Sequence, residues 1–107
     1  MQLGDDTYLV PLEQVYFIGA SGKYAYAHTR NKKFLTGFSI GELDERLGPT
    51  GRFLRVHRSY IINTDRVFKL TRDQRKNMVI VMADDSSSEL RVSDSYLQGV
   101  KQKLGIK

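Results

Sequence analysis

The segment with the richest chemistry is residues 53–63, in which apolar residues flank the polar insert His57-Arg58-Ser59. A loop held by buried residues on both sides is a rigid mount for functional side chains. Arginine can donate two parallel hydrogen bonds to guanine or to a phosphate, and serine and histidine can hold backbone phosphates. The insert therefore predicts contacts with nucleic acid, led by Arg58. The alternatives are a solvated Arg58 and a purely structural, hydrogen-bonding His57 beside Val56.

The charge distribution points to the same class of ligand. The net charge is +5 and the sequence pI is about 9.6. No acidic residue lies between Glu13 and Glu42 or between Glu45 and Asp65, although each segment contains four lysines or arginines. Cationic segments without internal counter-charges suit a polyanion. An ordinary solvated basic surface is the alternative.

Enzymatic, metal-binding and membrane functions lack their usual residues. The chain has no cysteine, no Gly-x-Ser-x-Gly motif and no phosphate-binding glycine loop, and its two histidines, His28 and His57, have no carboxylate at metal-ligand spacing. We expect no catalytic residues, no metal and no cofactor. Neither a signal peptide nor a membrane-spanning run is visible, which predicts a cytoplasmic location.

The scaffold that must hold these residues is predicted to be mainly β. A length of 107 residues allows one domain, folded over about residues 7–104. Short β-rich runs alternate with turn signals, the clearest being Ser21-Gly22 and Asp84-Asp85-Ser86. The predicted strands are residues 7–10, 15–20, 24–29, 33–36, 53–56, 60–62, 67–70, 78–82 and 89–92.

Two short helices interrupt this pattern. Ser39 and Glu42 have the spacing of a capping box, Ile40, Leu43 and Leu47 form an apolar stripe, and Gly48-Pro49 ends the helix. We expect Ser93 to cap a terminal helix. The apolar face of that helix would consist of Tyr96, Leu97, Val100 and Leu104, with Gly105 at its end.

Three parts of the sequence resemble the LytTR family, the DNA-binding output domain of LytR/AgrA-type response regulators. The central one is Phe53-x-Arg55-Val56-His57-Arg58-Ser59-Tyr60-Ile61-Ile62-Asn63. The others are residues 15–24 (Val-Tyr-Phe-Ile-x-Ala-Ser-Gly-Lys-Tyr) and residues 38–47 (Phe-Ser-Ile-x-Glu-Leu-x-Glu-Arg-Leu). The resemblance covers about residues 7–104 in the family's order and spacing. It implies about ten short strands in three small antiparallel sheets, with one mid-chain and one C-terminal helix.

The resemblance also implies how DNA is bound: loops enter successive major grooves and bend the duplex. The first contact segment is residues 21–24, the second residues 55–59 and the third residues 92–95. Lys23, Tyr24 and Arg58 are then the expected base contacts. The expected backbone contacts are Ser21, Arg55, His57, Ser59, Ser93 and Ser95.

Asp94 departs from the family pattern, because many members have arginine there. A carboxylate would repel phosphate, although it could accept a hydrogen bond from cytosine N4. The alternative is that Asp94 caps the last helix and contacts nothing.

The resemblance implies a regulator that binds promoter DNA at paired direct repeats. We expect a monomer that dimerises on DNA, driven in a longer protein by a partner domain such as a receiver. A different class of function is a basic, non-enzymatic module that binds an acidic protein. Single-strand or RNA binding is a third, because Tyr24 and Tyr26 share a strand face and could stack on bases. Arg72, Arg75 and Lys76 fit a solvated turn or an extra phosphate contact.

Overall fold

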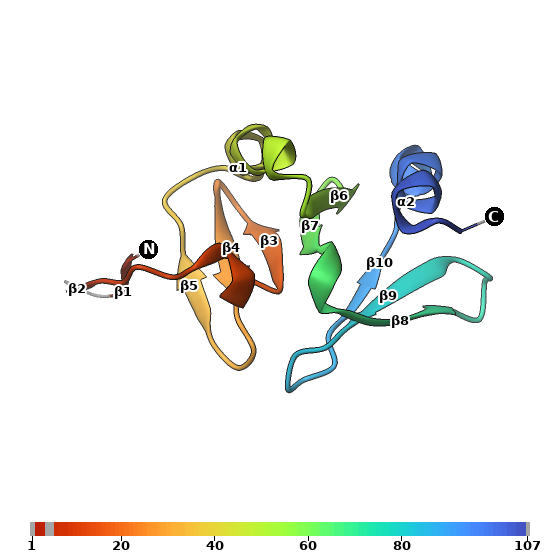
Figure 1. Cartoon of the computed structure of the whole chain (residues 1–107), viewed down its shortest axis with the longest axis horizontal. Coiled ribbons are helices and arrows are strands. Elements are labelled where there is room, and N and C mark those ends of the chain that lie inside the picture. The colour runs from red at the N-terminus through yellow and green to blue at the C-terminus, as the bar shows by residue number, and fades with distance from the viewer. Residues whose placement is uncertain (1, 4–5, 107) are drawn as a thin grey trace.

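The computed structural model describes residues 2–3 and 6–106 and confirms a mainly β fold. One sheet has the strand order β2-β1-β5-β4-β3-β7-β6 and the other β10-β9-β8, with every pairing antiparallel. The smaller sheet lies on the right of Figure 1. The strands are β1 Gln2–Leu3, β2 Asp6–Thr7, β3 Phe17–Ser21, β4 Tyr24–His28, β5 Lys33–Leu35, β6 Phe53–His57, β7 Tyr60–Asn63, β8 Val67–Arg72, β9 Met78–Met82 and β10 Glu89–Arg91.

Most predicted strands lie within two residues of the observed ones, and β9 matches at both ends. The strand predicted at residues 7–10 was wrong in extent, because β2 ends at Thr7. Pro11 has no backbone N–H and precedes a single 3₁₀ turn, Leu12–Gln14, so the chain leaves the sheet before it. The residues between β2 and this turn have no regular structure.

The number of sheets is two, not the three that the resemblance implied. Strand β3 pairs with β4 along one edge and with β7 along the other. In the second pairing Phe17 lies opposite Ile62 and Ile18 opposite Ile61. The meander β3–β5 and the hairpin β6–β7 therefore form one continuous sheet.

Helix α1, Ile40–Leu47, begins as the capping-box spacing predicted. The Ser39 hydroxyl oxygen accepts a hydrogen bond from the Glu42 backbone N–H at 3.2 Å. The same hydroxyl lies 3.1 Å from Glu42 Oε1 and donates to it. Leu43 and Leu47 are buried against the larger sheet. After α1 the chain makes a 3₁₀ turn, Gly48–Thr50.

Helix α2, Leu97–Leu104, has the predicted apolar face: Val100 is buried, with Leu97 and Leu104 packed beside it. The predicted Ser93 cap was wrong. Ser93 precedes a 3₁₀ turn, Asp94–Tyr96, and makes no side-chain cap hydrogen bond. This extra turn moves the start of α2 to Leu97, four residues beyond Ser93 and out of reach of its hydroxyl.

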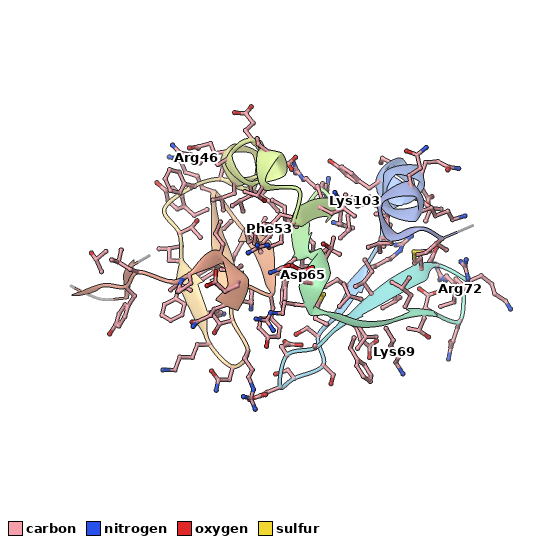
Figure 2. All side chains as sticks on the ribbon, in the orientation of Figure 1. Arg46, Phe53, Asp65, Lys69, Arg72 and Lys103 are labelled. Atoms are coloured by element: carbon pink, nitrogen blue, oxygen red, sulfur yellow. The ribbon has the colours of Figure 1, made fainter. Side chains whose placement is uncertain are left out.

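Each face of the larger sheet packs on its own apolar cluster. One face, with Ile18, Phe53 and Ile61, packs under α1, and Figure 2 labels Phe53 at that position. The other face, with Phe17 and Ile62, packs against the smaller sheet and α2. The alternation of Phe17 with Ile18 thus fixes strand register, since a one-residue slip would exchange the two clusters.

Asn63 is the buried polar residue that ties β7 to the start of β3. Its Nδ2 donates to the Val15 carbonyl at 2.9 Å, and its Oδ1 accepts from the Asp65 backbone N–H at 3.0 Å. We expect Asn63→Ala to lower the free energy of unfolding by roughly 1–3 kcal/mol, because it leaves buried groups unpaired. Urea unfolding monitored by circular dichroism measures this. Gln98→Ala, at an exposed helix position, is the control, and equal stability of the two variants would contradict this role.

Candidate nucleic-acid interface

The polar insert forms a tight turn between β6 and β7. The pairing of these strands slips between Arg55 and His57, and Val56 within that slip is fully buried. Such a β-bulge bends a strand and re-aims its side chains. The connecting loop is only Arg58-Ser59, and the side chain of Arg58 is exposed. The guanidinium is thus presented to solvent from a short loop whose base is anchored in the core.

His57 fixes the shape of this loop. Its Nδ1 accepts a hydrogen bond from the Ser59 backbone N–H at 3.0 Å, and its ring lies 5.4 Å from that of Tyr60. Burial lowers the pKa of His57, and the positive charges of Arg58 and Arg91 lower it further. A neutral imidazole is the form that can accept this bond. His57 therefore makes a structural hydrogen bond, which was the alternative to a DNA contact in the sequence analysis. Its Nε2 is left for any other partner.

Arg55 braces the same loop from behind. Its Nη2 donates to the Arg58 carbonyl at 2.6 Å and its Nε to the His57 carbonyl at 3.3 Å. Its Nη1 lies 3.5 Å from Asp44 Oδ2, on α1, and its guanidinium carbon lies 5.8 Å from the Tyr96 ring centroid. The side chain is only 20% exposed. The structure thus gives Arg55 intramolecular partners, and its predicted phosphate contact stays a prediction.

The first predicted segment is the two-residue turn between β3 and β4. Ser21 and Tyr24 close the hairpin as a pair, and Gly22 has a φ of +63° at the first position of the turn. Glycine adopts this left-handed backbone without strain, which suits a tight hairpin turn. The side chains of Ser21, Lys23 and Tyr24 are exposed.

The third predicted segment follows β10 and leads into α2. The backbone N–H of Ser93 donates to the Val56 carbonyl at 3.0 Å, which fixes the segment against the bulge of β6. Ser95 and Asp94 are exposed. The Ser93 hydroxyl is buried and has no hydrogen-bond partner among the described residues, and its predicted phosphate contact stays a prediction. Asp94 lies in the first turn of the 3₁₀ segment, and no side-chain hydrogen bond caps either that segment or α2.

Backbone hydrogen bonds link the β6–β7 hairpin to the neighbourhood of both other predicted segments. The Ala20 backbone N–H donates to the Ser59 carbonyl at 2.8 Å, which joins this turn to the residue before the first segment. The bond from Ser93 to Val56 joins it to the third. In Figure 1 the hairpin of β6 and β7 lies between the rest of the larger sheet and the smaller sheet with α2. Backbone hydrogen bonds therefore connect parts of the chain that lie far apart in sequence, and the three predicted segments together are called the rim below.

Arg91 is a further cation at this rim that the sequence did not single out. It is exposed at the end of β10, and its charge contributes to the lowered pKa of His57. The pKa of Asp73, in the turn between β8 and β9, is lowered by a hydrogen bond from the Asn77 backbone N–H and also by the charge of Arg91. The one sequence signal for Arg91 was its position directly before the predicted contact segment Val92–Ser95.

The residues considered for single-strand stacking and for an extra phosphate contact lie close to other groups of the chain itself. Lys33 Nζ lies 5.0 Å from the Tyr26 ring centroid, so a lysine of the chain itself occupies a face that a base would need. The Tyr24 ring has Lys23 Nζ at 5.7 Å. Arg72 ends β8, where its Nη1 donates to the Lys76 carbonyl at 2.9 Å across the turn to β9.

His28 packs its ring against the larger sheet. Its ring stacks on that of Phe17 at a centroid distance of 4.1 Å. Burial and the nearby Lys33 lower its pKa, and Asp84 opposes this shift. Within the described residues, no three histidine, aspartate or glutamate side chains are placed to hold a metal ion. No helix in that part of the chain is long and apolar enough to cross a membrane.

Comparison with known proteins points to a single family. The family model described as "LytTr DNA-binding domain" matches residues 5–105. A solved LytTr DNA-binding domain of a putative methyl-accepting/DNA response regulator from Bacillus cereus is 27% identical, with a TM-score of 0.84. The match covers 98% of this chain and 94% of that one.

Curated relatives include two kinds of transcription regulator. The transcriptional regulatory protein LytR of Staphylococcus aureus strain N315 is 26% identical over 106 residues, which cover 99% of this chain and 42% of LytR. The heme-containing CO-sensing transcriptional regulator RcoM 1 of Paraburkholderia xenovorans is 30% identical over 99 residues, which cover 92% of this chain and 36% of RcoM 1. The chain therefore spans less than half the length of these relatives.

Proposed function

Because the chain belongs to the LytTr DNA-binding domain family, we propose that it binds double-stranded promoter DNA with sequence specificity, its loop segments entering successive major grooves. DNA binding in transcription regulation is the function of the family; the loop contacts and the specificity are the proposal. It is supported above all by the backbone hydrogen bonds that tie the hairpin carrying residues 55–59 to Ala20, beside residues 21–24, and to Ser93, within residues 92–95.

The side chains at this rim, exposed except for the half-buried His57 and Ser59, divide into two proposed roles. Lys23, Tyr24 and Arg58 read base edges, since lysine and arginine donate to guanine O6 and N7 in the major groove. Ser21, Ser59, Ser95, Arg91 and the free nitrogen of His57 contact the sugar-phosphate backbone.

Arg55 and Ser93 have different places in this proposal. Arg55 acts through the loop that it braces and is a positioning residue. Ser93 contributes its backbone bond to Val56 and not its hydroxyl. Asp94 faces solvent without a cationic partner among the described residues, so it disfavours phosphate close by.

The arrangement of whole proteins on DNA is also part of the proposal. The chain covers 42% of LytR, so the rest of such a regulator has room for an input domain, for example a receiver. Two copies then occupy paired direct repeats, with dimerisation driven by that other domain.

Binding of random duplex DNA at several salt concentrations tests this function. Arg91 is the exposed cation that this proposal assigns to the backbone. Each phosphate neutralised contributes about −0.9 to the slope of log K against log salt, so affinity should fall clearly as salt rises. Fluorescence anisotropy of a labelled duplex measures it.

Two outcomes would contradict the proposal. The first is undetectable duplex binding at low salt, which favours the protein-interaction module. The second is efficient competition by single-stranded DNA or RNA at equal nucleotide concentration. Selection from a random duplex pool then supplies the target sequence for the specific measurements.

A further inference from the structure

Strand β8 is a sheet edge that buries almost none of its own side chains. It pairs only with β9 in the order β10-β9-β8, and five of its six residues are exposed. Phe68 is 67% exposed and Leu70 is 36% exposed. All five residues of β9 are buried. Val67 packs beside the core, whereas Phe68 and Leu70 do not belong to it.

A bulge sets Phe68 apart from the regular ladder. Val67 pairs with Met82 and Lys69 pairs with Val81, so Phe68 has no partner of its own on β9. The regular ladder resumes from Lys69 to Arg72. Bulges on edge strands bend the edge and re-aim a side chain. Here the bulge presents an aromatic ring beside four regularly extended residues.

The edge is strongly cationic. Lys69, Arg72, Arg75 and Lys76 lie on β8 and in the turn to β9, and Asp73 is the one acidic residue among them. The Asp73 carboxylate accepts hydrogen bonds from the backbone N–H groups of Arg75 and Asn77 and from Asn77 Nδ2. It is engaged in the turn and offers little to neutralise the cations. Figure 2 shows Lys69 and Arg72 projecting from the margin that β8 forms.

We propose that the outer edge of β8 binds an acidic, extended segment of another protein, which pairs with Lys69–Arg72 as an added strand. Apolar residues of the segment pack on Phe68 and Leu70, and its carboxylates face Lys69, Arg72, Arg75 and Lys76. Added strands obtain affinity from main-chain hydrogen bonds and specificity from alternate side chains.

Charge and polarity select this occupant over two others. A second copy of the chain would bring like charges together along the edge, which is unfavourable. DNA would suit the cations but would leave Phe68 without an apolar partner. In Figure 1 β8 runs along the lower margin, whereas α1 and α2 lie at the upper margin. This surface does not depend on the DNA-binding proposal.

Nuclear magnetic resonance with defined peptides tests the inference. The probe is a blocked eight-residue peptide of alternating glutamate and valine, and the comparison is the same peptide with lysine for glutamate. We expect the acidic peptide to shift β8 amide signals at submillimolar concentration and the basic peptide to shift none. Phe68→Ala should weaken binding at least about fivefold, as for an aromatic anchor. Leu9→Ala, at a 92% exposed position, should have no effect.

A charge-reversed variant makes the test independent of Phe68. Lys69→Glu combined with Arg72→Glu should abolish binding of the acidic peptide and create binding of the basic one. The amide spectrum of each variant reports its fold at the same time.

Several results would overturn the inference. The first is no binding of the acidic peptide at 1 mM, and the second is peptide shifts confined to residues 21–24 and 57–59. The others are β8 shifts on addition of duplex DNA and self-association that Phe68→Ala abolishes. The affinity of the wild-type protein for duplex DNA is measured in parallel. It tests the DNA-binding proposal alone, so failure of that proposal is distinguishable from failure of the β8 inference.

Discussion

Arg58→Ala is expected to weaken binding to the selected target duplex by about 1–3 kcal/mol while affecting a random duplex much less. Arg58 is exposed on a two-residue loop, and its carbonyl is held by Arg55 at 2.6 Å. The loop is thus fixed while the guanidinium is free to donate two hydrogen bonds to one guanine. Loss of those bonds should relax specificity at one base pair. Anisotropy titrations with the target and with single-substituted targets measure both effects.

Arg91→Ala is the matched comparison for this prediction. Both variants lose one exposed arginine charge from the same rim, so their net charges are equal. A backbone contact at Arg91 should weaken target and random duplexes to the same degree and reduce the salt slope by about 1. Equal losses on both duplexes for Arg58→Ala would contradict its base-reading role. Arg58→Lys should recover part of the affinity but less of the specificity, because lysine lacks the planar fork.

Local sequence signals predicted the elements well because their causes are local. The Ser39 cap and the apolar stripe of α1 need only a few neighbouring residues, and the helix begins where they place it. The turn at Gly22 follows from the need for a positive φ in a tight hairpin. Strand β9, a run of five apolar residues, is buried along its whole length as its composition indicates.

These local signals could not predict which distant segments pair with one another. Nothing near Phe17 in the sequence indicates that β3 pairs with β7, more than forty residues later. This pairing merges two of the expected sheets. Strand β1 consists of two residues and carries no periodicity from which it could be predicted.

The candidate site shows the same division between residue type and residue environment. Composition and resemblance selected Arg55 and Ser93 as phosphate contacts. The environment gave Arg55 carbonyl and carboxylate partners and buried the Ser93 hydroxyl. Arg91 was missed for the converse reason, since only the fold brings it near His57.

Arg55→Met is expected to weaken binding to the target duplex about tenfold, or 1.4 kcal/mol, without changing its salt dependence. The substitution keeps a long side chain but removes the donors to the carbonyls of His57 and Arg58. The Arg58-Ser59 loop then loses the brace that orients its guanidinium. Since Arg55 itself neutralises no phosphate in this account, the slope of log K against log salt should remain that of the wild type.

Asp44→Asn separates bracing from direct contact with DNA. Asp44 Oδ2 lies 3.5 Å from Arg55 Nη1 and holds the guanidinium toward α1. If Arg55 braces the loop, removal of this carboxylate should weaken DNA binding slightly, although it removes a negative charge near a polyanion. If Arg55 contacts phosphate, the same substitution should strengthen binding, and Arg55→Met should lower the salt slope by about 1. Faster amide exchange at Ser59 in both variants would accompany bracing, because the loop opens more often when its anchor is weakened.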